Sequence, residues 1–159
     1  MLNRKRQELH ALIAVTIERE QPELAAQQPE VVARHFSEAN LPDKAVPFWL
    51  KAADRLVLRY AVAETVDTLI AATADLKRMA TGETCDRLCL DVAMRLAQAR
   101  YLQGRFEEAI DSLMPEELRL VRLADPAVTG SFRFWLAHMN VRIGLWRSRT
   151  SCQSECGSG

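Results

Sequence analysis

Glycine and proline are scarce in this chain of 159 residues, and neither sign of charge is in excess. Six glycines and six prolines, with 48% hydrophobic residues, favour a helix-rich globular protein over a disordered one. The 21 basic residues equal the 21 acidic residues in number, so no strong net field attracts nucleic acid or anionic lipid. No apolar run approaches the roughly 20 residues of a membrane-spanning helix. The basic start at Arg4 to Arg6 precedes no signal-peptide core, so we expect a cytoplasmic protein.

The motifs of common catalytic and metal sites are also missing. No Gly-x-x-x-x-Gly-Lys-Ser/Thr phosphate loop and no Gly-x-Ser-x-Gly nucleophile elbow occurs. His10, His35 and His138 fall on three different predicted helices, and none belongs to a His-x-x-x-His pair. The sequence therefore predicts a protein without catalytic activity, cofactor or metal.

The four cysteines form two pairs with the same internal spacing, Cys85 with Cys89 and Cys152 with Cys156. Paired cysteines are compatible with a zinc site or disulfides. However, the two pairs lie far apart, and the second falls in a tail without a helical pattern. The alternative, which we favour, is two buried or half-buried helix thiols and two tail thiols, all reduced.

Seven segments carry apolar residues at helical spacing, and no long alternation typical of a strand occurs. They begin near residues 3, 29, 42, 62, 84, 105 and 126. Asn40 and Gly104 are expected to end helices in a left-handed conformation, and Gly144 to end the last. Pro115 should kink or split the sixth helix. The predicted fold class is all-α.

A short pattern recurs forty residues apart. Leu96-Ala97, Gly104 and Phe106 return as Leu136-Ala137, Gly144 and Trp146. Self-similarity of this kind is typical of a helical solenoid, in which each hairpin buries its apolar face against its neighbours. Small residues allow close approach of the two helices, and the aromatic residue fills the gap between hairpins.

These residues resemble the tetratricopeptide repeat (TPR), a helix–turn–helix unit of about 34 residues. One match consists of Ala97, Gly104, Phe106, Ala109 and Leu113, and another of Ala33, Phe36, Asn40, Ala45, Trp49 and Ala52. A third begins with Ala137, Gly144 and Trp146, but Arg149 replaces its next alanine. The resemblance implies a TPR-like α-solenoid of about seven antiparallel helices over residues 1–146.

A finer resemblance concerns residues 8–14, 29–36 and 45–50. They are similar to the TPR region of large bacterial signalling ATPases, some of which carry an adenylate/guanylate cyclase or transcription-factor domain. This implies a non-catalytic interaction scaffold for signal transduction, detached from such a parent. The alternative is a regulatory part of a cyclase or ATPase whose catalytic domains are absent from this chain.

In the TPR family the first helix of each hairpin lines a concave groove that receives a protein or peptide, or another domain of the same parent. Carrying these positions onto the chain predicts a groove of mixed polar, aromatic and methionine character. The positions are Arg34, Ser37, Glu38, Asp91, Met94, Gln98, Tyr101, Ser131, Phe134, His138 and Arg142.

Residues 147–159 are rich in serine, cysteine and glycine, and we expect them to be disordered. The preceding segment carries Phe132, Trp135, Met139 and Trp146 on a face that a following repeat helix would cover. Because that helix is missing, we expect self-association through residues 132–146.

Overall fold

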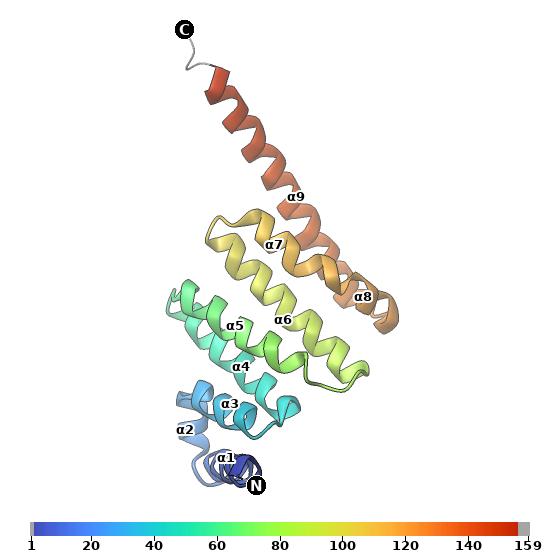
Figure 1. Cartoon of the computed structure of the whole chain (residues 1–159). Coiled ribbons are helices and arrows are strands. Elements are labelled where there is room, and N and C mark those ends of the chain that lie inside the picture. Colours follow the sequence, from blue (N-terminus) through green and yellow to red (C-terminus); the bar gives the residue numbers. More distant parts are fainter. Residues whose placement is uncertain (1, 156–159) are drawn as a thin grey trace.

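The computed structural model describes residues 2–155, with residues 2 and 145–155 as backbone only, and the described chain consists of helices joined by turns (Figure 1). The all-α prediction is confirmed for this part. The elements are α1 (Leu2–Glu20), α2 (Pro22–Gln27), α3 (Pro29–Glu38), α4 (Pro42–Leu58), α5 (Val62–Leu76), α6 (Glu83–Leu102), α7 (Phe106–Leu113), the 3₁₀ turn η1 (Met114–Glu116), α8 (Glu117–Leu123) and α9 (Pro126–Glu155). Within these residues, none of the helices has the length and apolar character needed to cross a membrane.

The longer helices pack in chain order. Helix α3 lies against α1, and the chain then packs stepwise, with each helix from α4 to α7 against the one before it (Figure 1). Helix α9 lies against α7. The apolar interior divides into two clusters, one running from α1 to α6 and the other from α6 to α9. Helix α6 contributes Val92 and Leu96 to the first cluster and Ala93 and Ala97 to the second, so it joins the two halves of the molecule.

Three of the turns between helices use the same left-handed cap. Asn40, Tyr60 and Gly104 have φ values of 58°, 58° and 76°. The next residue in each case donates a backbone hydrogen bond of 2.9–3.0 Å to a carbonyl five residues earlier. Such bonds satisfy helix-end carbonyls that would otherwise lack partners. The terminating roles predicted for Asn40 and Gly104 are confirmed, whereas Tyr60 carries no glycine or asparagine signal.

The structure corrects the predicted boundaries at two places and confirms the break predicted at Pro115. Residues 22–27 form the short helix α2 where only a connection was expected, because Pro22 occupies the first turn and needs no donor there. Pro115 splits the sixth predicted helix, as expected, into α7, η1 and α8. The end predicted at Gly144 is wrong, since α9 continues to Glu155.

Gly144 does not have the positive φ that would let it turn the chain, so it continues the helix instead. The expected tail therefore begins as helix over residues 147–155, and residues 156–159 lie outside the described part. The second half of α9 extends away from the other helices (Figure 1). Ala137, the predicted small packing residue of the third repeat, is exposed.

The apolar side chains of α9 are distributed differently from the prediction. Phe132 and Met139 are fully buried against the neighbouring helices, whereas Phe134 and Val141 are 65% and 62% exposed. Trp146 lies among the residues described as backbone only. Self-association through residues 132–146 stays a prediction, and Phe134 and Val141 are the described apolar residues available for it.

Candidate functional site

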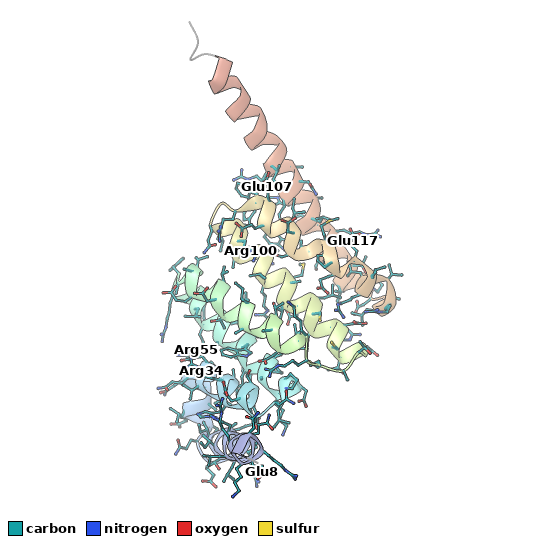
Figure 2. The ribbon with its side chains drawn as sticks, in the orientation of Figure 1. Glu8, Arg34, Arg55, Arg100, Glu107 and Glu117 are labelled. Carbon is teal, nitrogen blue, oxygen red and sulfur yellow. The ribbon has the colours of Figure 1, made fainter. Side chains whose placement is uncertain are left out.

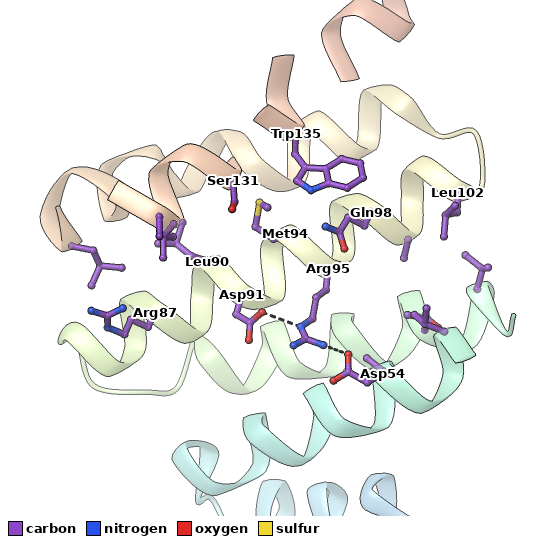
Figure 3. A pocket seen from close by; sticks show the side chains of 18 of the residues that line it. Asp54, Arg87, Leu90, Asp91, Met94, Arg95, Gln98, Leu102, Ser131 and Trp135 are labelled. Carbon is purple, nitrogen blue, oxygen red and sulfur yellow. Dashed lines mark hydrogen bonds and ion pairs between the residues drawn. The ribbon is translucent and has the colours of Figure 1, made fainter. Parts of the chain in front are cut away.

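An open groove of about 920 Å³ runs along α6 (Figure 3). Its walls come from α4 and α5 on one side and from α8 and α9 on the other. We call it the α6 groove. Its floor is mainly apolar, with Leu90, Met94 and Leu102 in a row. Cavities of this size and character are typical ligand sites in proteins.

The α6 residues of the groove repeat at helical spacing. Arg87, Asp91, Met94, Gln98 and Leu102 follow one another at steps of three or four positions, which places them on one face of the helix. The other faces of α6 pack against α5 and α7. The groove face spans 15 residue steps, or about 22 Å at the usual helical rise.

Arg95 lies in the groove between two carboxylates from different helices. Its Nε donates a 2.9 Å hydrogen bond to Asp91 Oδ1 on α6, and its Nη1 donates to Asp54 Oδ1 on α4 (Figure 3). Partial burial lowers the pKa of Arg95 and raises the pKa of Asp91. The groove therefore holds a guanidinium shared by two carboxylates in a partly desolvated setting.

A second arginine is held in the same way at the end of the groove. Arg87 binds Glu83 on α6 and Asp125 before α9, each at 3.1 Å. The hydrogen bonds that Arg87 donates to Asp125 and to Glu83 raise its pKa. Asp125 also accepts hydrogen bonds from the backbone N–H groups of Ala127 and Val128, and so caps α9. The bond from Arg87, followed by these backbone bonds, lowers the Asp125 pKa.

Aromatic side chains gather at the α9 side of the groove. Trp135 lines the groove, and its ring contacts those of Tyr101, Phe134 and His138 with centroids 5.8–6.1 Å apart. The Tyr101 hydroxyl and His138 Nε2 lie at hydrogen-bonding distance, 3.0 Å. This aromatic cluster joins α6 to α9 and leaves Phe134 65% exposed.

Seven of the eleven predicted groove residues lie in or beside the α6 groove. Asp91, Met94, Gln98 and Ser131 line it. The other three belong to the aromatic cluster: Tyr101, Phe134 and His138.

The remaining four predicted residues are outside the groove. Ser37 donates a 2.8 Å hydrogen bond to the buried carboxylate of Asp75, and Glu38 pairs with Arg6 on α1. Arg34 and Arg142 are exposed and do not line the groove. Helix α3 therefore contributes nothing to the site, because its predicted groove face lies toward α1 and the end of α5.

Asp54, Arg95 and Trp135 belong to the site but were not among the predicted groove residues. Arg95 follows Asp91 by four positions, a spacing typical of an ion pair within one helix. That signal was available in the sequence. The partnership with Asp54, 41 positions away, was not, because it depends on how α4 and α6 are placed across α5.

A cysteine cluster and a histidine cluster lie away from the groove. Cys85 and Cys89 are buried with their sulfur atoms 3.9 Å apart, and burial raises the pKa of Cys89 to about 12. This agrees with the buried helix thiols favoured from the sequence, and a raised pKa makes a thiol less reactive. Among the described residues no group of three or more His, Cys, Asp or Glu side chains is arranged to hold a metal ion. The side chains of Cys152 and Cys156 are not described.

The second cluster is a histidine pair between α1 and α3. The Nδ1 atoms of His10 and His35 are 2.8 Å apart, so one must donate and the other accept. Burial, followed by the charges of His10 and Arg34, lowers the His35 pKa, while Glu38 opposes this shift. Figure 2 shows this end of the molecule, with Glu8 of α1 and Arg34 of α3 labelled.

Comparison with protein-family models, curated proteins and solved structures finds no match for this chain. The function is therefore inferred from the residues of the groove.

Proposed function

We propose that this chain is a non-catalytic, TPR-like scaffold that holds a segment of a protein partner in the α6 groove. The α-solenoid assignment rests on the repeat residues and on the packing of helices in chain order. A signalling role beside a bacterial cyclase or ATPase, in the cytoplasm, is part of this proposal and rests on the resemblance in residues 8–50.

The observation that carries the proposal is the composition of the groove. Its apolar floor of Leu90 and Met94 is flanked by Gln98, Ser131 and the aromatic ring of Trp135. Aromatic and methionine side chains are enriched where proteins bind partners, and a few polar groups fix the orientation of the bound segment. The charged side chains described in the groove, Arg95 with Asp54 and Asp91, are paired with one another. This pairing suits the binding of a partner better than acid–base catalysis.

A peptide-library selection tests the proposal. The exposed Ser131 lines the groove, so Ser131→Trp should fill it without disturbing the core. Ala137→Trp is the matched control, because Ala137 is also exposed on α9 but does not line the groove.

We expect selected peptides to bind the wild-type chain and the Ala137→Trp variant, and to lose binding to Ser131→Trp. Circular dichroism would check that all three proteins are equally folded. If the selected peptides bind Ser131→Trp as tightly as the wild type, the groove is not the binding site and the proposal fails.

A further inference from the structure

The charges of the α6 groove are not balanced once their partners are included. Arg95 is bound by Asp54 and Asp91, and Arg87 by Glu83 and Asp125. Each guanidinium is therefore matched by two carboxylates. The charged side chains that line the groove balance one another, and Glu83 and Asp125, which lie outside the lining, add two negative charges at its Arg87 end. The cluster of Arg95, Asp54 and Asp91 by itself carries one negative charge in excess. The chain as a whole has a formal net charge of +0, so this excess is local.

The carboxylates beside Arg95 keep acceptor capacity for a further cation. Arg95 binds the Oδ1 atoms of Asp54 and Asp91, and within the described residues their Oδ2 atoms accept no hydrogen bond. The side chains of Asp54 and Asp91 are 58% and 46% exposed, so a ligand can reach them.

The opposite wall is also suited to cations. The Trp135 ring lines the groove across from α4, and the faces of aromatic rings attract ammonium and guanidinium groups. By contrast, an acidic ligand would meet the repulsion of the carboxylates already bound to Arg87 and Arg95. Charge complementarity therefore favours a basic ligand.

The α6 face of the groove is about 22 Å long, which suits a short extended segment. An extended chain rises about 3.3 Å per residue, so about seven residues cover the same length. Its side chains alternate, so apolar ones can face Leu90 and Met94 while basic ones reach the carboxylates.

We propose that the α6 groove binds an extended segment of about seven residues in which basic and apolar side chains alternate. This inference rests on the proposed function and specifies the chemistry of the partner segment. The basic side chains lie between the carboxylates of Asp54 and Asp91 and the ring of Trp135.

Three labelled seven-residue peptides provide the test, each alternating leucine with lysine, glutamine or glutamate. Fluorescence anisotropy measures their affinity for the full chain. We expect the lysine peptide to bind at least about tenfold more tightly than the glutamate peptide, with the glutamine peptide between them. Added salt should weaken the lysine peptide most.

Asp54→Asn with Asp91→Asn is the decisive variant, because it leaves Arg95 without its carboxylates. The lysine peptide should lose about tenfold in affinity, and the preference between lysine and glutamate should reverse. Asp111→Asn with Glu117→Gln is the matched control, since it removes two exposed carboxylates that do not line the groove. That variant should bind the lysine peptide within about twofold of the wild type.

Each other outcome overturns the inference in a distinct way. Equal affinities for lysine and glutamine peptides, with binding still lost in Ser131→Trp, would refute the charge preference and keep the proposed function. Lysine-peptide binding that survives Ser131→Trp would place the peptide elsewhere. Failure of all three peptides to bind would also overturn the inference, and the library selection would then decide the proposed function independently.

Discussion

The most exacting prediction concerns Asp75, a carboxylate that is 1% exposed in the first apolar cluster. Its Oδ2 accepts a 2.8 Å hydrogen bond from Trp49 Nε1, and its Oδ1 accepts a 2.8 Å bond from Ser37. Arg78 binds the same Oδ1 atom. One side chain thus links α3, α4 and α5.

Asp75→Ala should lower the free energy of unfolding by roughly 2–4 kcal/mol. Leaving the buried Trp49 N–H without an acceptor costs about 1–3 kcal/mol, and the lost bond from Ser37 adds about 1 kcal/mol. The Arg78 side chain is 43% exposed and returns to water, so its pairing adds little. At roughly 2–4 °C per kcal/mol, the melting temperature should fall by about 4–16 °C.

Asp75→Asn is the matched control, because its oxygen can still accept from Trp49 while its amide faces Ser37. The bond from Arg78 is lost and the bond with Ser37 reverses, because the amide N–H then donates to the serine hydroxyl, so the cost should stay below about 1.5 kcal/mol. Urea unfolding followed by circular dichroism measures both variants, and a double-mutant cycle with Trp49→Phe isolates the indole bond. An Asp75→Ala variant within about 0.5 kcal/mol of the wild type would refute this account of the cluster.

Three further predictions concern the glycines, a histidine and the buried cysteines. Gly104→Ala should lower the free energy of unfolding by about 1 kcal/mol because φ is +76° there, whereas Gly144→Ala should raise it by about 0.5–1 kcal/mol because Gly144 lies within a helix. Thermal melting that ranks the two variants otherwise would contradict the backbone conformations at these residues. Because the folded-state pKa of His35 is lowered, the unfolded chain takes up the proton first, and stability should fall as pH drops below about 6.5. Urea unfolding of His35→Gln should show a weaker pH dependence, and an unchanged one would refute the assignment. Cys85 and Cys89 should react slowly with a thiol reagent in the folded chain and rapidly in denaturant, whereas fast native reaction would show that they are accessible.

Local signals in the sequence predicted the features that depend on one helix or one turn, such as where a helix ends. Asn40 and Gly104 end helices because few other residues adopt a left-handed conformation cheaply. The groove positions of α6 were predicted from the resemblance to the TPR family, and their helical spacing places them on one face of a single element. The helix end predicted at Gly144 is wrong because glycine permits a turn without requiring one, and here the helix continues.

Contacts between distant helices could not be predicted in this way. Asp75 pairs with residues 26 and 38 positions away, and Asp86 binds Arg119 and Arg122 from α8. The burial of both carboxylates could not be predicted, because nothing in the neighbouring sequence distinguishes them from exposed aspartates. The role of Asp54 in the α6 groove could not be predicted either, because it depends on the position of α4 relative to α6.

The shape and the charge of the α6 groove have separate structural origins, which makes them separately testable. Its width depends on the separation of α4 and α6, and both helices pack extensively on α5. The ion pair between Asp54 and Arg95 also joins α4 to α6, but its side chains are 58% and 31% exposed. Pairs with that much exposure contribute at most about 1 kcal/mol, so α5 rather than the ion pair sets the width. Removing the carboxylates therefore changes the groove's electrostatic preference while its apolar floor and its dimensions are retained.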